Sequence, residues 1–298
     1  MEAQVRTAFE TTRPLDIFST LAPIGLGPSL RIDRDGVWRA TRTPDGPSTL
    51  HLKFSAGRID VEAWGPGAEW ASSRAAALCG EQDDASAFRP QHRLIAELHR
   101  RHPGLRLPRT QAVFEALVPA VLGQKVTTIE AEAGYRALVQ ALGEPAPGPA
   151  GLKLPPSPQV LARTPYWAFH RFGVERRRAE VIIRAARSAN RLEEIITMDL
   201  ASAYRRLEAF PGVGPWTAAK VALVALGDPD AVPVGDYHLP HAVGYALDGT
   251  PRSTDERMLE LLAPYVGQRG RVIRLLTISG IAAPRFGPKQ PLRNIINN

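Results

Sequence analysis

Asp236 is the residue in this sequence best placed to carry out chemistry. It ends the segment Val-Pro-Val-Gly-Asp (232–236), 22 residues beyond Gly214 and at the start of a predicted helix. A carboxylate at the mouth of a cleft can stabilise positive charge that develops on a sugar, and it can orient or deprotonate an attacking water. An N-cap is the ordinary alternative role for such an aspartate. The two roles are compatible, because one oxygen can cap a helix while the other faces the cleft.

The segment 207–220, Leu-Glu-Ala-Phe-Pro-Gly-Val-Gly-Pro-Trp-Thr-Ala-Ala-Lys, predicts a hairpin of helices. One amphipathic helix ends at Phe210, a tight turn covers 211–214, and a second helix begins near Pro215, since proline is favoured at a first helical position. The first N–H groups of that helix have no helical partner, so they can bind a phosphate that the glycines leave unobstructed. Val213 can anchor the turn in the core. The alternative is an ordinary turn between two helices, in which proline and glycine only end one helix and start the next.

The charge balance agrees with a polyanionic partner. Lys and Arg number 37 against 30 Asp and Glu, a net charge of +7, and nucleic acid is the commonest polyanion. An arginine-rich proteome background would produce the same excess.

The chain is 44% apolar and 22% charged, as in soluble globular proteins. No apolar run reaches the roughly 18 residues that span a membrane, and the first residues lack a signal-peptide pattern. We expect a cytoplasmic, nucleoid-associated protein with no membrane partner.

Metal and disulfide chemistry is limited by composition. Cys79 is the single cysteine, which excludes a disulfide framework, a Cys-ligated zinc site and an iron–sulfur cluster held by four cysteines. His238 and His241 lie three residues apart beside Asp236, but a zinc site needs a further ligand that the sequence does not offer.

The elements that must position these residues fall into two parts, so the predicted fold class is α+β. Alternating apolar and polar stretches over 29–65 predict an antiparallel sheet, and 67–79 predicts a helix packed on it. From about residue 86 the apolar spacing becomes helical. We therefore expect an N-terminal α+β sheet domain over 1–85 and an all-helical domain over 86–298. Predicted helices cover 88–100, 111–122, 128–142, 159–162, 175–190, 201–209, 216–226, 237–247, 254–263 and 270–280, with N-caps expected at Thr110, Thr128, Ser157 and Ser253.

Two of these segments resemble a known family. Residues 207–218 followed by 232–236 look like the signature of the helix-hairpin-helix–Gly-Pro-Asp DNA glycosylase superfamily. The segment 114–127, Phe-Glu-Ala-Leu-Val-Pro-Ala-Val-Leu-Gly-Gln-Lys-Val-Thr, resembles the other strong motif of that family. A sheet followed by helices is similar to the bacterial inducible 3-methyladenine branch. The resemblance covers about residues 10–280.

The resemblance implies roles for residues at matching positions. Asp236 would be the catalytic carboxylate, and the backbone carbonyls of Glu208, Phe210 and Val213 would hold Na⁺ or K⁺, with no other cofactor required. Lys125 stands where the family wedges a side chain into the duplex, although it is also consistent with a solvated loop lysine. The residues implied in DNA binding are Gln124, Lys125, Gly212, Val213, Gly214 and Thr217.

Trp216 separates two mechanisms within the family. Bifunctional members carry there a lysine that attacks the sugar and forms a Schiff base, which an indole cannot do. Tryptophan at this position is typical of the alkylation-repair branch, where it stacks on an electron-poor base. A core aromatic beneath the hairpin is the alternative. Lys220 lies one helical turn after Trp216 and therefore on the same face of the base pocket, where it would repel a cationic base.

The leading hypothesis is a monofunctional DNA glycosylase that flips alkylated, 3-methyladenine-type bases out of double-stranded DNA and hydrolyses the N-glycosidic bond with the help of Asp236. It would act in base excision repair as a monomer and without lyase activity. A non-catalytic or altered-substrate protein that recognises distorted or damaged DNA on the same scaffold is the alternative. An unrelated helical enzyme with an incidental Pro-Gly-Val-Gly turn is a third. The aromatic cluster Tyr166–Phe172, which contains His170, has no family role. We expect it to pack in the core, with a surface that faces DNA as the alternative.

Overall fold

The computed structural model describes residues 4–11, 13–25 and 27–284. Its N-terminal part is a five-stranded antiparallel sheet with the strand order β1-β5-β4-β3-β2. The four strands after β1 form a meander, and β1 pairs with β5 at the sheet edge. The sheet confirms the predicted fold class, whereas β1 was not predicted. Its strands are β1 Val5–Glu10, β2 Leu30–Asp33, β3 Gly36–Thr43, β4 Gly46–Ser55 and β5 Arg58–Trp64.

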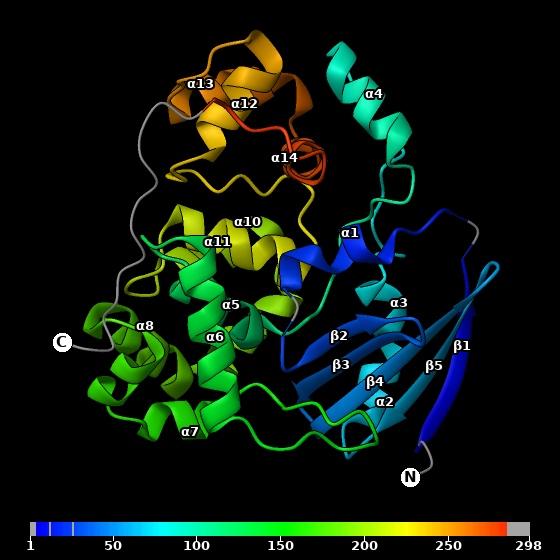
Figure 1. The fold of residues 1–298 in the computed structure, drawn as a ribbon, viewed down its shortest axis with the longest axis vertical. Helices are drawn as coiled ribbons and strands as arrows, with labels where there is room; N and C mark the ends of the chain where they lie inside the picture. Colours follow the sequence, from blue (N-terminus) through cyan, green and yellow to red (C-terminus); the bar gives the residue numbers. More distant parts are fainter. Residues whose placement is uncertain (1–3, 12, 26, 285–298) are drawn as a thin grey trace.

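One face of the sheet is covered by α2 (Ala68–Ser73) and α3 (Ala75–Leu78), which lie behind it in Figure 1. Alternate strand residues such as Leu50, Leu52 and Val61 are buried in a common core with these helices, as the period of two requires. The predicted single helix over 67–79 is therefore two short helices that meet at Arg74.

The rest of the chain is helical, as predicted. α5 lies in the middle of this part and is buried along most of its length, with α6, α8, α9 and α11 packed against it. A separate core joins α4, α12, α13 and α14, which lie together at the top of Figure 1. The helices not yet bounded are α1 Ile17–Leu21, α4 Arg93–Arg101, α5 Val113–Leu122, α6 Thr128–Leu142, α7 Pro158–Arg163, α8 Arg176–Arg187, α9 Ala189–Glu193, α10 Leu200–Glu208, α11 Pro215–Val221, α12 Leu239–Asp248, α13 Asp255–Leu262 and α14 Arg269–Ile278. No helix in the described ranges is both long and apolar enough to cross a membrane.

Three of the four N-caps predicted from the sequence are wrong. Ser157 caps α7 as expected, but Thr127 and Thr254 take the places predicted for Thr128 and Ser253. Thr127 is the N-cap of α6 because it forms a capping box with Glu130. The Glu130 carboxylate accepts the backbone N–H of Thr127, and the Thr127 hydroxyl accepts the backbone N–H of Glu130.

The cap predicted at Thr110 is wrong for a different reason. The carboxylate of Glu193, at the end of α9, accepts the N–H groups of Val113 and Phe114 at 2.9 and 2.8 Å. A residue distant in sequence thus satisfies the start of α5. Burial raises the pKa of this carboxyl, and the two N–H bonds oppose that shift.

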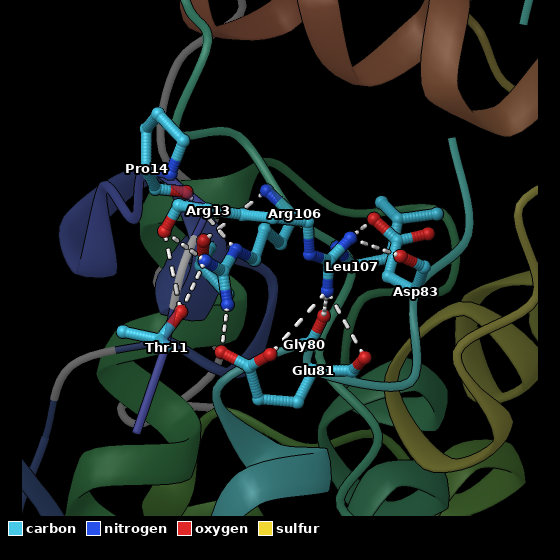
Figure 2. Close-up of polar contacts among 9 residues, drawn as sticks. Thr11, Arg13, Pro14, Gly80, Glu81, Asp83, Arg106 and Leu107 are labelled. Carbon is cyan, nitrogen blue, oxygen red and sulfur yellow. Dashed lines mark hydrogen bonds and ion pairs between the residues drawn. The ribbon is translucent and has the colours of Figure 1, made fainter. Parts of the chain in front are cut away.

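A buried polar network joins the N-terminal segment to the loop before α4 and to the segment after it (Figure 2). The guanidinium of Arg106 donates to the hydroxyl of Thr11 at 2.7 Å and pairs with Glu81. Asp83 accepts the N–H of Leu107 at 3.0 Å, and its other oxygen pairs with Arg271 of α14. Asp83 and Arg271 are both more than nine-tenths buried. The two parts of the chain are therefore bonded to each other where they meet.

Candidate active site

The predicted hairpin is present between α10 and α11. α10 ends at Glu208, two residues before the predicted end, and Pro215 is the first residue of α11. Gly212 has φ of +95°, and a Cβ there would lie 2.3 Å from Cγ2 of Val181 on α8. Val213 is 5% exposed, which confirms that it anchors the turn in the core. Gly214, by contrast, faces open space, so the start of α11 can be approached closely by a ligand.

The loop that follows α5 is attached to this hairpin. The Gln124 side-chain amide donates to the carbonyl of Gly212 and to the hydroxyl of Thr217, both at 2.9 Å. Lys125, the next residue, is exposed and has φ of +57°, an uncommon left-handed conformation for a residue with a side chain. The structure therefore brings Gln124, Gly212 and Thr217 together and places Lys125 at the tip of the loop beside them.

Asp236 is held on both sides. Its Oδ1 accepts the backbone N–H groups of His238 and Leu239 at 2.9 Å each, so it caps α12 from two residues before the formal N-cap position. Its Oδ2 accepts the indole N–H of Trp216 at 2.9 Å. The capping role is thus confirmed for one oxygen. The second oxygen, which we expected to face the cleft, accepts the indole N–H and keeps a lone pair for water.

Trp216 and Lys220 share a face of α11, as their spacing predicts. The far edge of the indole lies against Gly123, where an added Cβ would be 3.2 Å from Cη2. The ammonium of Lys220 lies 5.9 Å from the indole centroid. Trp216 is only partly buried, which argues against the alternative of an enclosed core aromatic.

The electrostatic setting of Lys220 is unusual. Its side chain is accessible to water, yet desolvation by the surrounding protein lowers the pKa of its ammonium, with the charge of Asp236 opposing the shift and that of Arg274 adding to it. Arg274 of α14 is itself 7% exposed, and burial lowers the pKa of its guanidinium to about 10.

Sequence reasoning missed Tyr237 and Arg274. Tyr237 directly follows Asp236 and is 76% exposed, with its ring edge-on to His238 at 4.9 Å. A bulky aromatic directly after the candidate carboxylate was the available signal. Arg274 carried no local signal, because only the packing of α14 brings it close to α11. His241 accepts the N–H of Ser253 at 3.1 Å, and the described residues contain no cluster of three metal-ligating side chains.

The aromatic cluster Tyr166–Phe172 divides between core and surface. Phe169 and Phe172 are buried in the main core, as expected. Trp167 is 63% exposed, which corrects that expectation, and it lines a surface groove with arginines of α7 and α8. The guanidinium of Arg176 lies 4.6 Å from the ring centroid of Tyr166.

The proteins to which this chain is similar are named as DNA repair enzymes or DNA glycosylases. No family model matches the chain. Over 141 residues it is 36% identical to a "Probable bifunctional transcriptional activator/DNA repair enzyme AlkA" of Mycobacterium tuberculosis, covering 46% of this chain and 28% of that protein. It is 35% identical over 131 residues to "DNA-3-methyladenine glycosylase 2" of Escherichia coli, covering 43% and 46% of the two chains. The chain thus aligns with less than half the length of either relative.

Solved structures extend the likeness over nearly the whole chain. A 3-methyladenine DNA glycosylase from Archaeoglobus fulgidus superposes with a TM-score of 0.76 at 21% identity, covering 92% of this chain and 98% of that one. An 8-oxoguanine glycosylase/lyase from Clostridium acetobutylicum, solved with double-stranded DNA, superposes with a TM-score of 0.66 at 13% identity, covering 94% and 98%. At these identities the likeness establishes the fold, including the order of sheet and helices.

Proposed function

We propose that this chain, which has the helix-hairpin-helix DNA glycosylase fold and resembles the inducible 3-methyladenine branch, is a monofunctional glycosylase that removes alkylated bases from double-stranded DNA. One observation carries the proposal. The carboxylate of Asp236 is held between the start of α12 and the indole of Trp216, beside a hairpin whose Gly214 is open to a ligand.

The hairpin would hold the DNA backbone. The first N–H groups of α11 have no partner within the helix and lie at its positive end, so they suit a phosphate. Gln124 keeps this turn and the Lys125 loop together, which lets Lys125 fill the space that a flipped nucleotide leaves in the duplex. The carbonyls of Glu208, Phe210 and Val213 would bind Na⁺ or K⁺. That of Phe210 already accepts the N–H of Val213 at 2.9 Å, which leaves one lone pair for the ion. A bound cation would brace the turn and add positive charge near the phosphate.

Asp236 would serve the chemical step. Cleavage of the N-glycosidic bond develops positive charge on the sugar, and a fixed carboxylate nearby stabilises that state. Water then adds to C1′ and gives its proton to Asp236, so the products are the free base and an abasic site. Trp216 would stack on the flipped base, because its indole edges are already held by Asp236 and Gly123. A monomer suffices for this mechanism, which would act on the chromosome in the nucleoid.

The test is base release from duplexes that each carry one damaged base, with the parent protein and the Asp236→Asn variant. We expect Asn to slow release roughly 100- to 1000-fold, because it cannot neutralise charge on the sugar. Asp45→Asn, at an exposed turn between β3 and β4, is the matched control and should not change the rate. Binding to abasic-site DNA should stay nearly intact in both variants.

An Asp236→Asn variant that keeps more than about a tenth of the parent rate would contradict the role given to this carboxylate. A parent that binds damaged duplex without releasing any base would support a non-catalytic DNA-binding protein instead.

A further inference from the structure

A groove between α7 and α8 combines an exposed aromatic ring with positive charge. Its volume is about 580 Å³, within the roughly 300–1,000 Å³ of pockets that hold small ligands. Ala162 and Ile183 supply apolar surface, and Trp167, which also lines the groove, is 63% exposed. The two helices lie at the lower left of Figure 1, on the opposite side from the sheet. The groove shares no residue with the site around Asp236.

The ring of Trp167 is open to a ligand. No aromatic ring or cation among the described residues stacks on it. The neighbouring ring of Tyr166, by contrast, is covered by the guanidinium of Arg176 at 4.6 Å and meets the ring of His170 edge-on at 6.1 Å. An exposed indole leaves a large apolar area in water, and a flat ring from another molecule would cover that area.

Three arginines line the same groove, Arg163 of α7 and Arg184 and Arg187 of α8. All three are exposed, and none forms a hydrogen bond or ion pair with another residue in the part of the chain that the structure describes. Arg184 and Arg187 are three residues apart, so they lie on one face of α8. The acidic residue of the groove, Glu180, is already paired with Arg176 at 2.7 Å. The groove therefore has uncompensated positive charge and suits an anion.

We propose that this groove binds a segment of single-stranded DNA. One unpaired base would stack on Trp167, and the phosphates beside it would pair with the three arginines. Basic grooves with stacking rings hold single strands in this way, without regard to sequence, and the planar guanidinium of arginine can bind two phosphate oxygens at once. Bases inside a duplex cover one another and offer no free face to an indole. A run of acidic residues in a protein would pair with the arginines but would leave the indole uncovered.

The place of the groove on α8 favours DNA as the source of the strand. Val181 of the same helix lies against the hairpin turn, since a Cβ added at Gly212 would be 2.3 Å from Cγ2 of Val181. Arg184 follows Val181 by three residues, so a strand bound there would lie beside the hairpin to which we assign the duplex. DNA with a single-stranded stretch next to a duplex could then contact both surfaces, and two linked contacts raise the affinity. The proposal goes beyond base release and does not require it.

Fluorescence anisotropy with a labelled oligothymidine of about ten nucleotides tests the stacking contact in the full chain. Trp167→Ala should weaken binding about fivefold or more, the contribution of one stacked base. Trp167→Phe should keep most of the affinity, because a ring remains. Phe54→Ala removes an exposed ring from β4 and is the matched control, which should bind like the parent. A blunt-ended duplex of the same length should bind Trp167→Ala as tightly as the parent.

The salt dependence of oligothymidine binding tests the arginines. Each phosphate contact with a single strand contributes about 0.7 to the slope of log affinity against log salt. Arg184→Ala should therefore reduce the slope by about 0.7, whereas Trp167→Ala should lower the affinity without changing the slope. Arg100→Ala on α4 removes another exposed arginine that has no partner among the described residues. It is the control for net charge and should leave the slope unchanged.

Several results would overturn the proposal. One is an unchanged affinity of Trp167→Ala for oligothymidine, and another is an equal loss for the duplex, which would make the groove part of the duplex interface. Equal changes of slope in Arg184→Ala and Arg100→Ala would show that net charge alone is responsible. Tighter binding of polyglutamate than of oligothymidine, weakened in Trp167→Ala, would assign the groove to an acidic protein segment. Base release from damaged duplex should be unchanged in all of these variants, so a failure here leaves the proposed function intact.

Discussion

At the scale of single residues, Asp236 combines structural and chemical roles in one carboxylate. One oxygen caps α12 and the other accepts from an indole. A carboxamide has a single acceptor oxygen, so the Asn variant must lose one of these bonds. A lost hydrogen bond of this kind costs about 1–3 kcal/mol where the donor is buried. The loss of activity in Asp236→Asn should therefore be read beside its melting temperature, with abasic-site binding as the measure of a preserved interface.

We expect the enzyme to release the base and leave the DNA strand intact. A lyase needs an amine that reaches C1′, and Trp216 occupies the position of that amine in bifunctional relatives. Lys220 begins a turn further along α11, about 6 Å by the helical rise of 1.5 Å per residue. Borohydride treatment during the reaction should trap no covalent adduct, and strand breaks should appear only after alkali. An adduct that disappears in Lys220→Ala would show instead that Lys220 attacks the sugar.

At the scale of elements, the two hairpin glycines should fail in different ways when changed to alanine. Gly212→Ala combines a φ of +95° with a Cβ 2.3 Å from Val181, so it should lower the free energy of unfolding by about 1–3 kcal/mol. Gly214→Ala meets no neighbour within 4 Å and should keep the stability of the parent. Its methyl group would instead obstruct a phosphate at the start of α11 and weaken DNA binding. Denaturant unfolding and fluorescence anisotropy measure the two effects.

Gly235→Ala is the matched control for strain alone. Gly235 has φ of +89° and no neighbour within 4 Å, so this variant carries the unfavourable backbone conformation without the clash. If Gly212→Ala and Gly235→Ala lose the same stability, contact with α8 is not what fixes the hairpin. If Gly214→Ala binds DNA as tightly as the parent, the open face of the turn is not the phosphate site.

The sequence predicted features that depend on residues a few positions apart, and it missed those that depend on residues far apart along the chain. The hairpin, Pro215 at a helix start and the burial of Val213 were predictable, because glycine, proline and apolar spacing act over a few residues. The cap of α5 was not, because it comes from Glu193, some 80 residues away along the chain. The bond between Trp216 and Asp236 spans 20 residues and likewise depends on tertiary packing.

Helix boundaries show the same limit. Apolar spacing placed a helix over 88–100, yet α4 begins at Arg93, since His92 supplies the N-cap. The predicted helix over 175–190 breaks at Ser188, where α8 ends and α9 begins. Both segments keep helical spacing, so periodicity alone could not reveal where each helix ends.

At the scale of the whole molecule, the net charge of +7 should make duplex binding depend strongly on salt. Each phosphate neutralised by a basic group releases counterions, and the logarithm of the affinity falls by about 0.9 per contact for each tenfold rise in salt. We expect a slope that corresponds to several contacts, measured by anisotropy from low to physiological salt. Lys125→Ala should reduce the slope by about one contact if its ammonium meets a phosphate. An affinity that salt does not change would contradict the nucleic-acid interface altogether.

The buried ion pair between Asp83 and Arg271 should hold the two parts of the chain together. Removal of one partner leaves an uncompensated buried charge, so Arg271→Met should cost about 3–5 kcal/mol. The double variant Asp83→Asn, Arg271→Met leaves no lone charge and should recover part of that loss. Denaturant unfolding of the parent and the three variants forms a double-mutant cycle. Additive losses, with no recovery in the double variant, would show that the pair is not coupled.

The same pair gives the molecule an order of assembly during synthesis. The meander β2 to β5 joins neighbouring strands through short turns, so it can form soon after it leaves the ribosome. Asp83, however, must wait for a partner 188 residues later in the chain. At a translation rate of about 5–20 residues per second, that wait is roughly 10–40 s. Throughout this interval the nascent chain carries a completed sheet beside a carboxylate that lacks its arginine, and the arrival of α14 completes the ion pair between the first part of the protein and the last.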